Sequence, residues 1–169
     1  ADDKYKTLRD WLTEREDDIK TVAELKVLKR DFPGVQYMNL ELNEGDQEGD
    51  QEGDQEAIER WEARRIQAYK DLMATFKDLA KINPYFQRIR VINKDTRTTI
   101  LSTIKDDVGN KMHTGIILED DVNFSVIRQD DRSSLVEISK RIDSKKTKDD
   151  YYLVLSINIQ KIIGPILYR

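Results

Sequence analysis

The residues that could support catalysis are few in this sequence. It contains one histidine, His113, and no cysteine, and it lacks the Gly-x-Ser-x-Gly, phosphate-loop and Gly-x-Gly-x-x-Gly patterns, which argues against most nucleophilic and nucleotide-dependent mechanisms. Carboxylates are plentiful, but they are spread along polar segments and do not form a positioned pair with separated pKa values. A hydrolase that uses carboxylates is a minor alternative, and we expect no enzyme activity, no cofactor and no metal site.

Polar side chains alternate with apolar ones in three segments that have the composition of β-strands. Side chains of a strand point alternately to its two faces, so the polar residues of each segment would share one face and the apolar residues would lie against a helix. The polar sets could converge on one face of a sheet or could simply face water. They are Arg88 and Arg90; Glu137, Ser139 and Arg141; and Tyr152, Ser156 and Asn158.

The segment Asn83–Thr103 is where the chain changes from helix to strand. Asn83-Pro84 ends a helical pattern, because proline lacks a backbone donor and disfavours the helical region for the preceding residue. An alternating run follows in Arg88–Ile92, then a polar turn in Asn93–Asp95 and a second β-rich run in Thr98–Thr103. Asn and Asp favour such turns through local hydrogen bonds to the backbone. The pattern predicts a helix that leads directly into a β-hairpin.

Two amphipathic helices are predicted before the hairpin. Apolar residues recur at steps of three and four from about Asp3 to Phe32, where Pro33-Gly34 follows, and again from about Ala57 to Ile82, as in a helix with one buried face. We expect the two helices to pack antiparallel. The first would be roughly 45 Å long. Its apolar face would pack along its own domain or would also pair with its copy in a second subunit.

An acidic repeat separates the two predicted helices. Gly45-Asp46-Gln47-Glu48 is repeated twice more, ending at Glu56, and glycine at every fourth position opposes a stable helix. We therefore expect a mobile acidic loop over residues 43–56, preceded by a brief strand or extended piece in Val35–Leu42. A calcium site is not expected, because the spacing fits neither an EF-hand loop nor a glycine-rich nonapeptide repeat.

After the hairpin, an irregular segment is followed by three β-like runs with short polar joints. Together with the hairpin these runs predict an α+β fold class, with long N-terminal helices packed on a five-stranded antiparallel sheet. We expect a single domain over residues 1–169. Its helical part is 1–82 and its sheet part is 83–169. The irregular segment is Ile104–Asp121, and the runs are Asn123–Arg128, Leu135–Ile142 and Tyr151–Ile159.

Bulk composition sets limits on the partners. The chain has 169 residues, of which 38% are hydrophobic and 37% are charged, with a formal net charge of −4. Nucleic-acid binding usually requires a basic face, so we expect no nucleic-acid partner. The sequence has neither a signal stretch nor a long apolar run, so it is expected neither to span a membrane nor to carry its own export signal. An excised soluble piece of a membrane protein would look the same.

The order of these elements resembles the start of a Cache domain. The residues that carry the resemblance are the long helix, the pattern P-Y-F-x-x-I-x-V-I from Pro84 to Ile92, the polar turn, and a second strand ending in Ser102-Thr103. Leu8–Ile19 is similar to the stretch after the first transmembrane helix of such sensors, and Tyr152–Ile159 resembles their last strand. Cache domains are PAS-like extracytoplasmic sensor modules of histidine kinases, chemoreceptors and related membrane proteins.

The resemblance implies a ligand site on the sheet face beneath Ile104–Asp121. Arginine suits a carboxylate ligand, because its planar fork donates two charge-assisted hydrogen bonds, and a histidine there could line the pocket or respond to pH. The Arg-x-Trp-Tyr signature of the amino-acid-sensing branch is missing from the expected segment, so an amino-acid ligand held in that way is not expected. The candidate ligand-binding residues are Arg90, His113, Arg128, Ser139, Arg141 and Tyr152.

Two functions of different classes follow from these observations. The first is an extracytoplasmic (periplasmic) ligand-sensing domain of a membrane receptor, in particular a histidine kinase of a two-component system, tethered to the membrane in the full-length protein. Its partners would be a small-molecule ligand such as a carboxylate and a second copy paired through the N-terminal helix. The alternative is a ligand-free dimerisation and spacer module built on the same helix.

Overall fold

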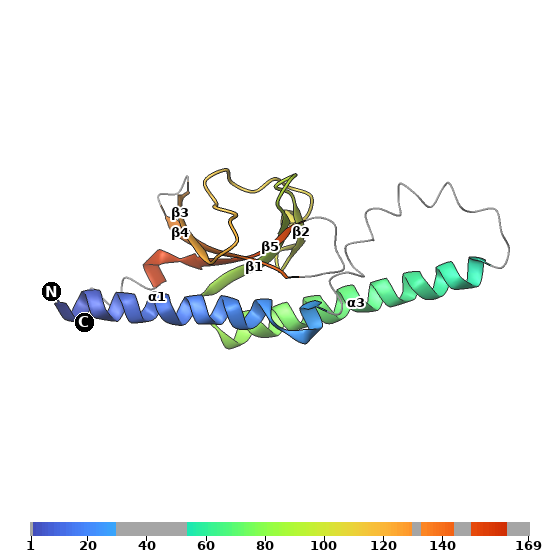
Figure 1. The fold of residues 1–169 in the computed structure, drawn as a ribbon, viewed down its shortest axis with the longest axis horizontal. Helices are drawn as coiled ribbons and strands as arrows, with labels where there is room; N and C mark the ends of the chain where they lie inside the picture. Colours follow the sequence, from blue (N-terminus) through green and yellow to red (C-terminus); the bar gives the residue numbers. More distant parts are fainter. Residues whose placement is uncertain (1, 30–53, 130–132, 144–149, 162–169) are drawn as a thin grey trace.

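The computed structural model describes residues 2–29, 54–129, 133–143 and 150–161. Within these ranges, two long helices pack on one face of a five-stranded antiparallel sheet (Figure 1). This arrangement confirms the predicted α+β fold class with a PAS-like sheet. The opposite face of the sheet is covered by the irregular connection between the second and third strands, which arches over it in Figure 1.

The second long helix begins earlier than predicted. Helix α3 spans Asp54–Ile82, so it includes the last three residues of the acidic repeat, for which the sequence predicted a loop. No glycine follows position 53 in this stretch, and acidic residues in a first helical turn interact favourably with the positive end of the helix dipole. The predicted strand at Val35–Leu42 and the rest of the repeat lie outside the described residues, as do residues 162–169.

The sequence predicted one helix from Asp3 to Phe32, but the helix is interrupted after Ala23; residues 26–29 are helical again, and Phe32 lies outside the described residues. Helix α1 spans Asp2–Ala23, and Leu25 N–H donates to the Val22 carbonyl at 3.1 Å, a short-range bond that tightens the last turn. A new turn then forms, in which Lys29 N–H donates to the Leu25 carbonyl at 3.2 Å. This change of direction buries Leu28 completely in the core, which stabilises the bend by about 1.5–3 kcal/mol.

The last strand in the sequence lies at the centre of the sheet. The strand order is β2-β1-β5-β4-β3, and every neighbouring pair is antiparallel. All residues of β5 except Asn158 are buried, as expected for a central strand covered on both faces. The strands are β1 Phe86–Asn93, β2 Thr99–Ser102, β3 Asn123–Arg128, β4 Ser134–Arg141 and β5 Tyr151–Asn158.

The hairpin predicted after Asn83-Pro84 is confirmed. Asn83 Oδ1 accepts a hydrogen bond from Tyr85 N–H at 3.1 Å where α3 ends. In the turn between β1 and β2, Asn93 Oδ1 accepts from Asp95 N–H at 2.9 Å, and Arg97 adopts a left-handed φ of 55°. The irregular segment Ile104–Asp121, called the cover segment below, contains one short 3-10 helix, η1, at Lys105–Asp107.

The main core lies between the helices and the sheet. The helices run in opposite directions and overlap beneath the sheet (Figure 1), with α1 against β4 and β5 and with α3 against β1. A smaller apolar cluster lies between the other face of the sheet and the cover segment; it contains Ile92, Met112, Ile116, Leu118, Ile127, Tyr152 and Val154. The main core includes Ile19, Val22, Leu28, Leu72, Phe76, Ile89, Val91, Ile138, Leu153 and Leu155.

A cation–π cluster fastens α1 to the junction between α3 and β1. The guanidinium carbon of Arg15 lies 5.3 Å from the ring centroids of both Trp11 and Tyr85, and Arg15 Nε lies 3.0 Å from Asp18 Oδ2. Asn83 Nδ2 also donates to Asp18 Oδ2 at 3.5 Å. Since Arg15 is buried, these contacts are worth more than they would be at an exposed site.

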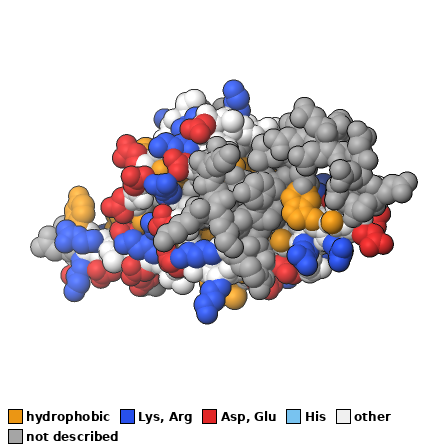
Figure 2. Space-filling view, turned by 45° about the vertical axis from the view of Figure 1, so that its right-hand side comes forward, with side chains coloured by type: hydrophobic (Ala, Val, Ile, Leu, Met, Phe, Trp, Pro, Cys, Tyr) orange, Lys and Arg blue, Asp and Glu red, His pale blue; other side chains and the backbone are white. Residues whose placement is uncertain are grey.

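Charges of both signs are interspersed on the surface drawn in Figure 2. Blue and red side chains alternate there, in keeping with 29 basic and 33 acidic residues in the whole chain. The helices of the described part include none that is long and apolar enough to cross a membrane.

The corrected end of α1 can be tested with a matched pair of leucine substitutions. Leu28→Ala should lower the free energy of unfolding by about 2–5 kcal/mol, because it leaves a cavity in the core. Leu8→Ala, at a side chain that is 38% exposed, should lower it by less than about 1 kcal/mol. Urea denaturation of the two variants checks this, and equal losses would contradict the bend that buries Leu28.

Candidate functional site

Strand register places four polar residues in one row across the sheet. Arg88 of β1 is paired with Ser156 of β5, which is paired with Glu137 of β4, which is paired with Ser125 of β3. Paired residues on neighbouring strands point to the same face, here the face beneath the cover segment. Arg90 lies in the next row, beside Val154. The polar residues that alternate in the sequence therefore converge on one face and do not simply face water.

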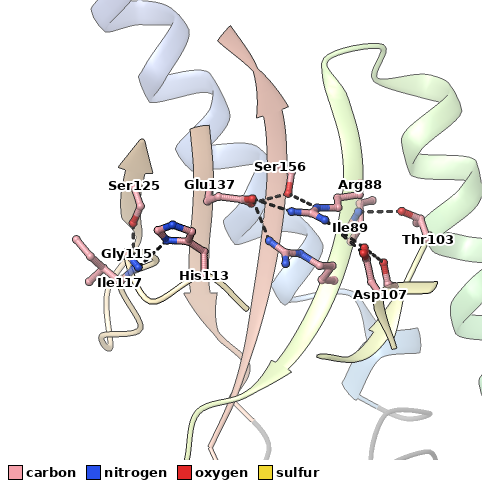
Figure 3. Close-up of polar contacts among 12 residues, drawn as sticks. Arg88, Ile89, Thr103, Asp107, His113, Gly115, Ile117, Ser125, Glu137 and Ser156 are labelled. Carbon is pink, nitrogen blue, oxygen red and sulfur yellow. Dashed lines mark hydrogen bonds and ion pairs between the residues drawn. The ribbon is translucent and has the colours of Figure 1, made fainter. Parts of the chain in front are cut away.

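Glu137 is the centre of this row. Its side chain is 1% exposed, and Oε1 lies 3.0 Å from Arg90 Nη2 and 3.2 Å from Arg88 Nη2. Its other oxygen, Oε2, accepts a short hydrogen bond from the Ser156 hydroxyl, and Figure 3 shows Ser156 between Glu137 and Arg88. One buried carboxylate thus binds two guanidinium groups and a hydroxyl.

Arg88 joins this row to the cover segment. Its Nε donates to Ser156 Oγ at 3.0 Å, and its Nη1 lies 3.3 Å from Asp107 Oδ2 in η1. Asp107 Oδ2 also accepts a hydrogen bond from Ser102 Oγ at 2.9 Å. A single guanidinium therefore links β1, β4, β5 and the cover segment (Figure 3).

Arg90 is charged but incompletely paired. Its side chain is 4% exposed, and desolvation by burial lowers its pKa from the usual value while the charge of Glu137 opposes that change. Arginine nevertheless stays protonated in proteins. Its Nε has no hydrogen-bond partner within the ranges that the structure describes. A buried donor without an acceptor is costly.

A cavity of about 340 Å³ lies beside this row. Arg88 and Arg90 of β1 and Glu137 of β4 are charged residues of its wall, Arg128 and Gln129 border it at the end of β3, and His113 and Ile116 of the cover segment form another part of the wall. Arg128, at the end of β3, is exposed and forms no ion pair with any described residue. The lining residues are Arg88, Arg90, His113, Ile116, Ile127, Arg128, Gln129, Leu135 and Glu137.

The described charges at the cavity favour an anion. Three arginines line it, and the carboxylates paired with them are Glu137 and Asp107, which leaves one positive charge. His113 Nδ1 accepts a hydrogen bond from Gly115 N–H at 2.9 Å, so a neutral imidazole would carry its proton on Nε2. The cavity can therefore offer guanidinium and imidazole donors to an anionic group.

Three of the six residues predicted from the sequence line this cavity: Arg90, His113 and Arg128. The other three lie on the same face of the sheet. Ser139 is in the row of Arg90, beyond Val154, and Arg141 and Tyr152 are with Ile92 in the next row. The role of all six in ligand binding stays a prediction.

Ser139, Arg141 and Tyr152 each have a structural environment away from the cavity. Ser139 donates from Oγ to the Ile117 carbonyl at 2.5 Å and so holds the cover segment. Arg141 Nη2 lies 2.8 Å from Asp150 Oδ1. Tyr152 is fully buried in the smaller apolar cluster, where desolvation raises the pKa of its hydroxyl.

The sequence-based site did not include Arg88, Glu137, Asp107 or Gln129. Alternation had placed Arg88 and Glu137 on the correct face, but their contact depends on β5 lying between β1 and β4. Asp107 lies in the irregular segment, where no periodicity indicates direction. The detectable signal was charge complementarity between the polar sets of two predicted strands.

A second cavity of about 380 Å³ lies between α3 and the end of β2. Three exposed lysines, Lys70, Lys77 and Lys105, stand around side chains that include Tyr69 and Met73. None of its charged lining residues is buried, so this cavity has no counterpart of the buried Arg90 and Glu137. The described part of the chain contains no group of His, Asp and Glu residues suited to hold a metal ion.

Comparisons with known proteins give a likeness of fold only. No known protein family and no curated protein matches this sequence. A domain of a sensory box/GGDEF family protein from Vibrio parahaemolyticus is 12% identical, with a TM-score of 0.46 over 88% of this chain and 64% of that one. The extracellular domain of a protein described as a histidine kinase is 12% identical, with a TM-score of 0.44 over 89% of this chain and 62% of that one.

This chain thus spans less than two thirds of either solved structure.

The separate environments of Tyr152 and Ser139 predict opposite responses to loss of a hydroxyl. The Tyr152 hydroxyl is buried without a hydrogen-bond partner in the described part of the chain, so Tyr152→Phe should leave the free energy of unfolding unchanged or slightly higher. Ser139→Ala removes a bond to the cover segment and should lower it by about 0.5–1.5 kcal/mol. Urea denaturation measures the free energy of unfolding of both variants. A large decrease in Tyr152→Phe would mean that the Tyr152 hydroxyl has a hydrogen-bond partner.

Proposed function

We propose that this chain is the extracytoplasmic ligand-sensing domain of a membrane signalling receptor, in particular a sensor histidine kinase, and that it binds a small anion such as a carboxylate. The observation that carries the proposal is the cavity of about 340 Å³ on the sheet face opposite the helices, with an excess of one positive charge among its described residues. Cavities with a few convergent polar groups are the usual form of small-molecule sites.

Arg128 and Arg90 are the residues that would contact the anion. Arg128 brings a charge with no described counter-ion at the rim, and Arg90 brings a buried N–H that lacks an acceptor. The Nε2–H of His113 would donate a further hydrogen bond from the cover segment. An anion held between β3, β1 and the cover segment would thus draw three parts of the structure together.

The location of the cavity supports a path from ligand to helices. The buried charges of its floor are on β1 and β4, and the opposite face of these strands packs against α3 and α1, respectively. A ligand shifts a conformational equilibrium only as far as it binds one state better than the other. Closure of the cover segment over the anion would supply that difference, and the strands would transmit it to the helices.

The cellular setting is proposed from the sequence. The resemblance to Cache domains favours a periplasmic position, a membrane tether in the full-length protein and a two-component output. The acidic net charge of −4 favours a partner other than nucleic acid. The chain offers no catalytic constellation by its residue types, so we propose that the domain itself is not an enzyme.

A thermal-shift screen against carboxylates, amino acids, amines, sugars and divalent ions tests the anion site. A ligand present at a hundred times its dissociation constant stabilises the folded state by about 2.7 kcal/mol, and we expect this gain from a small carboxylate. Arg128→Gln should abolish the gain, while the matched control Arg141→Gln, outside the cavity, should retain it. Stabilisation only by cations or sugars, or an equal loss in both variants, contradicts the proposal.

A second candidate function is dimerisation through the N-terminal helix. Tyr5 is 74% exposed and Leu8 is 38% exposed on α1, although apolar side chains of this size gain free energy on burial. A second copy of the chain would cover them. This function is compatible with ligand sensing and would stand alone if no ligand bound.

Dimerisation can be measured by sedimentation equilibrium over a range of protein concentrations. The double variant Tyr5→Ser with Leu8→Ser should weaken self-association by at least about tenfold, which corresponds to 1.4 kcal/mol. The control Val126→Ser changes an exposed apolar side chain of β3 and should have no effect. A wild-type chain that is monomeric at every concentration would exclude this function.

A further inference from the structure

The carboxylate of Glu137 is already paired with two arginines of the cavity, the buried Arg90 and the half-buried Arg88. Glu137 lies within 3.0 Å of Arg90 and 3.2 Å of Arg88, and its second oxygen accepts from Ser156. Both oxygens are therefore engaged, and the side chain is 1% exposed. Water cannot screen a charge at such a depth as it does at the surface.

The charge that remains for a ligand is consequently small. Arg90 has only Glu137 as a counter-ion among the described residues, Arg88 shares Glu137 with it and also pairs with Asp107, and Arg128 has no described counter-ion. One negative charge on a ligand would complete the balance. A second negative charge would have no cation left and would lie near the buried carboxylate of Glu137, where repulsion between like charges is strong.

We propose that Glu137 is a specificity-determining residue, which limits the cavity to ligands with a single negative charge and excludes dianions. This inference rests on the proposed anion site and names its ligand class. The cavity of about 340 Å³ has room for either kind of small organic acid. The charge of the ligand, and not its size, would decide between them.

The inference predicts the effect of removing each carboxylate. Glu137→Gln keeps the size of the side chain and removes its charge, which leaves two positive charges for a ligand. Asp107→Asn does the same at a half-buried position in η1. Asp107→Asn is the safer variant for folding, because loss of one partner of a buried ion pair is strongly destabilising.

The test is an NMR titration of the full 169-residue chain with propionate and with malonate, which are similar in size and differ by one carboxylate. At about pH 8 an ordinary imidazole is neutral, and malonate is a dianion. The wild-type chain should bind propionate at least about tenfold more tightly than malonate. Glu137→Gln and Asp107→Asn should each shift this ratio toward malonate by on the order of tenfold or more.

The matched control is Asp120→Asn. Asp120 is an acid with an 85% exposed side chain that pairs with Arg141 outside the cavity, so this variant should keep the wild-type ratio. A dispersed amide spectrum shows that each variant is folded. If Glu137→Gln is unfolded, Asp107→Asn still tests the charge balance on which the role of Glu137 rests: an unchanged ratio of the two affinities overturns the inference.

The outcomes separate this inference from the proposed function. If the wild-type chain binds both acids and neither variant changes the ratio of the two affinities, the role of Glu137 is overturned and the anion site stays in place. If the wild-type chain binds neither acid but the variants bind malonate, the proposed function of the natural cavity is overturned and the role of Glu137 is supported. No binding in any form of the chain overturns both.

Discussion

The buried ion pair between Glu137 and Arg90 is the interaction on which the rest of the site depends. A carboxylate and a guanidinium that are 1% and 4% exposed are costly to bury and are retained only when they are well partnered. Here one carboxylate serves two arginines and a serine. The geometry fixes the floor of the cavity, whose described charges balance, and the excess positive charge that suits an anion is that of Arg128 at the rim.

The same charges connect the two faces of the sheet. On one face they meet the cover segment through Asp107, and on the other face their strands pack against α1 and α3. The cation–π cluster of Arg15 adds a second connection, from α1 to the junction between α3 and β1. The cavity and both helices are therefore joined through β1 and β4.

Much of the fold follows from sequence periodicity, but the site follows only in part. The alternation in Arg88–Ile92 and Leu135–Ile142 predicted the strands and their faces, and Asn83-Pro84 predicted the end of α3. The end of α1 was missed, because the burial of Leu28 is a tertiary contact. Tyr152 and Arg141 share a face with Glu137 but lie in another row, and strand order and register, which set the rows, are not encoded locally.

The most direct test of this account is a crystal of the chain soaked with 3-bromopropionate, whose bromine can be located by anomalous scattering. We expect a peak inside the cavity, with the carboxylate between Arg90 and Arg128 and the Glu137 ion pairs intact. Bromine only at the lysines around the second cavity, or no ordered bromine at all, would contradict it.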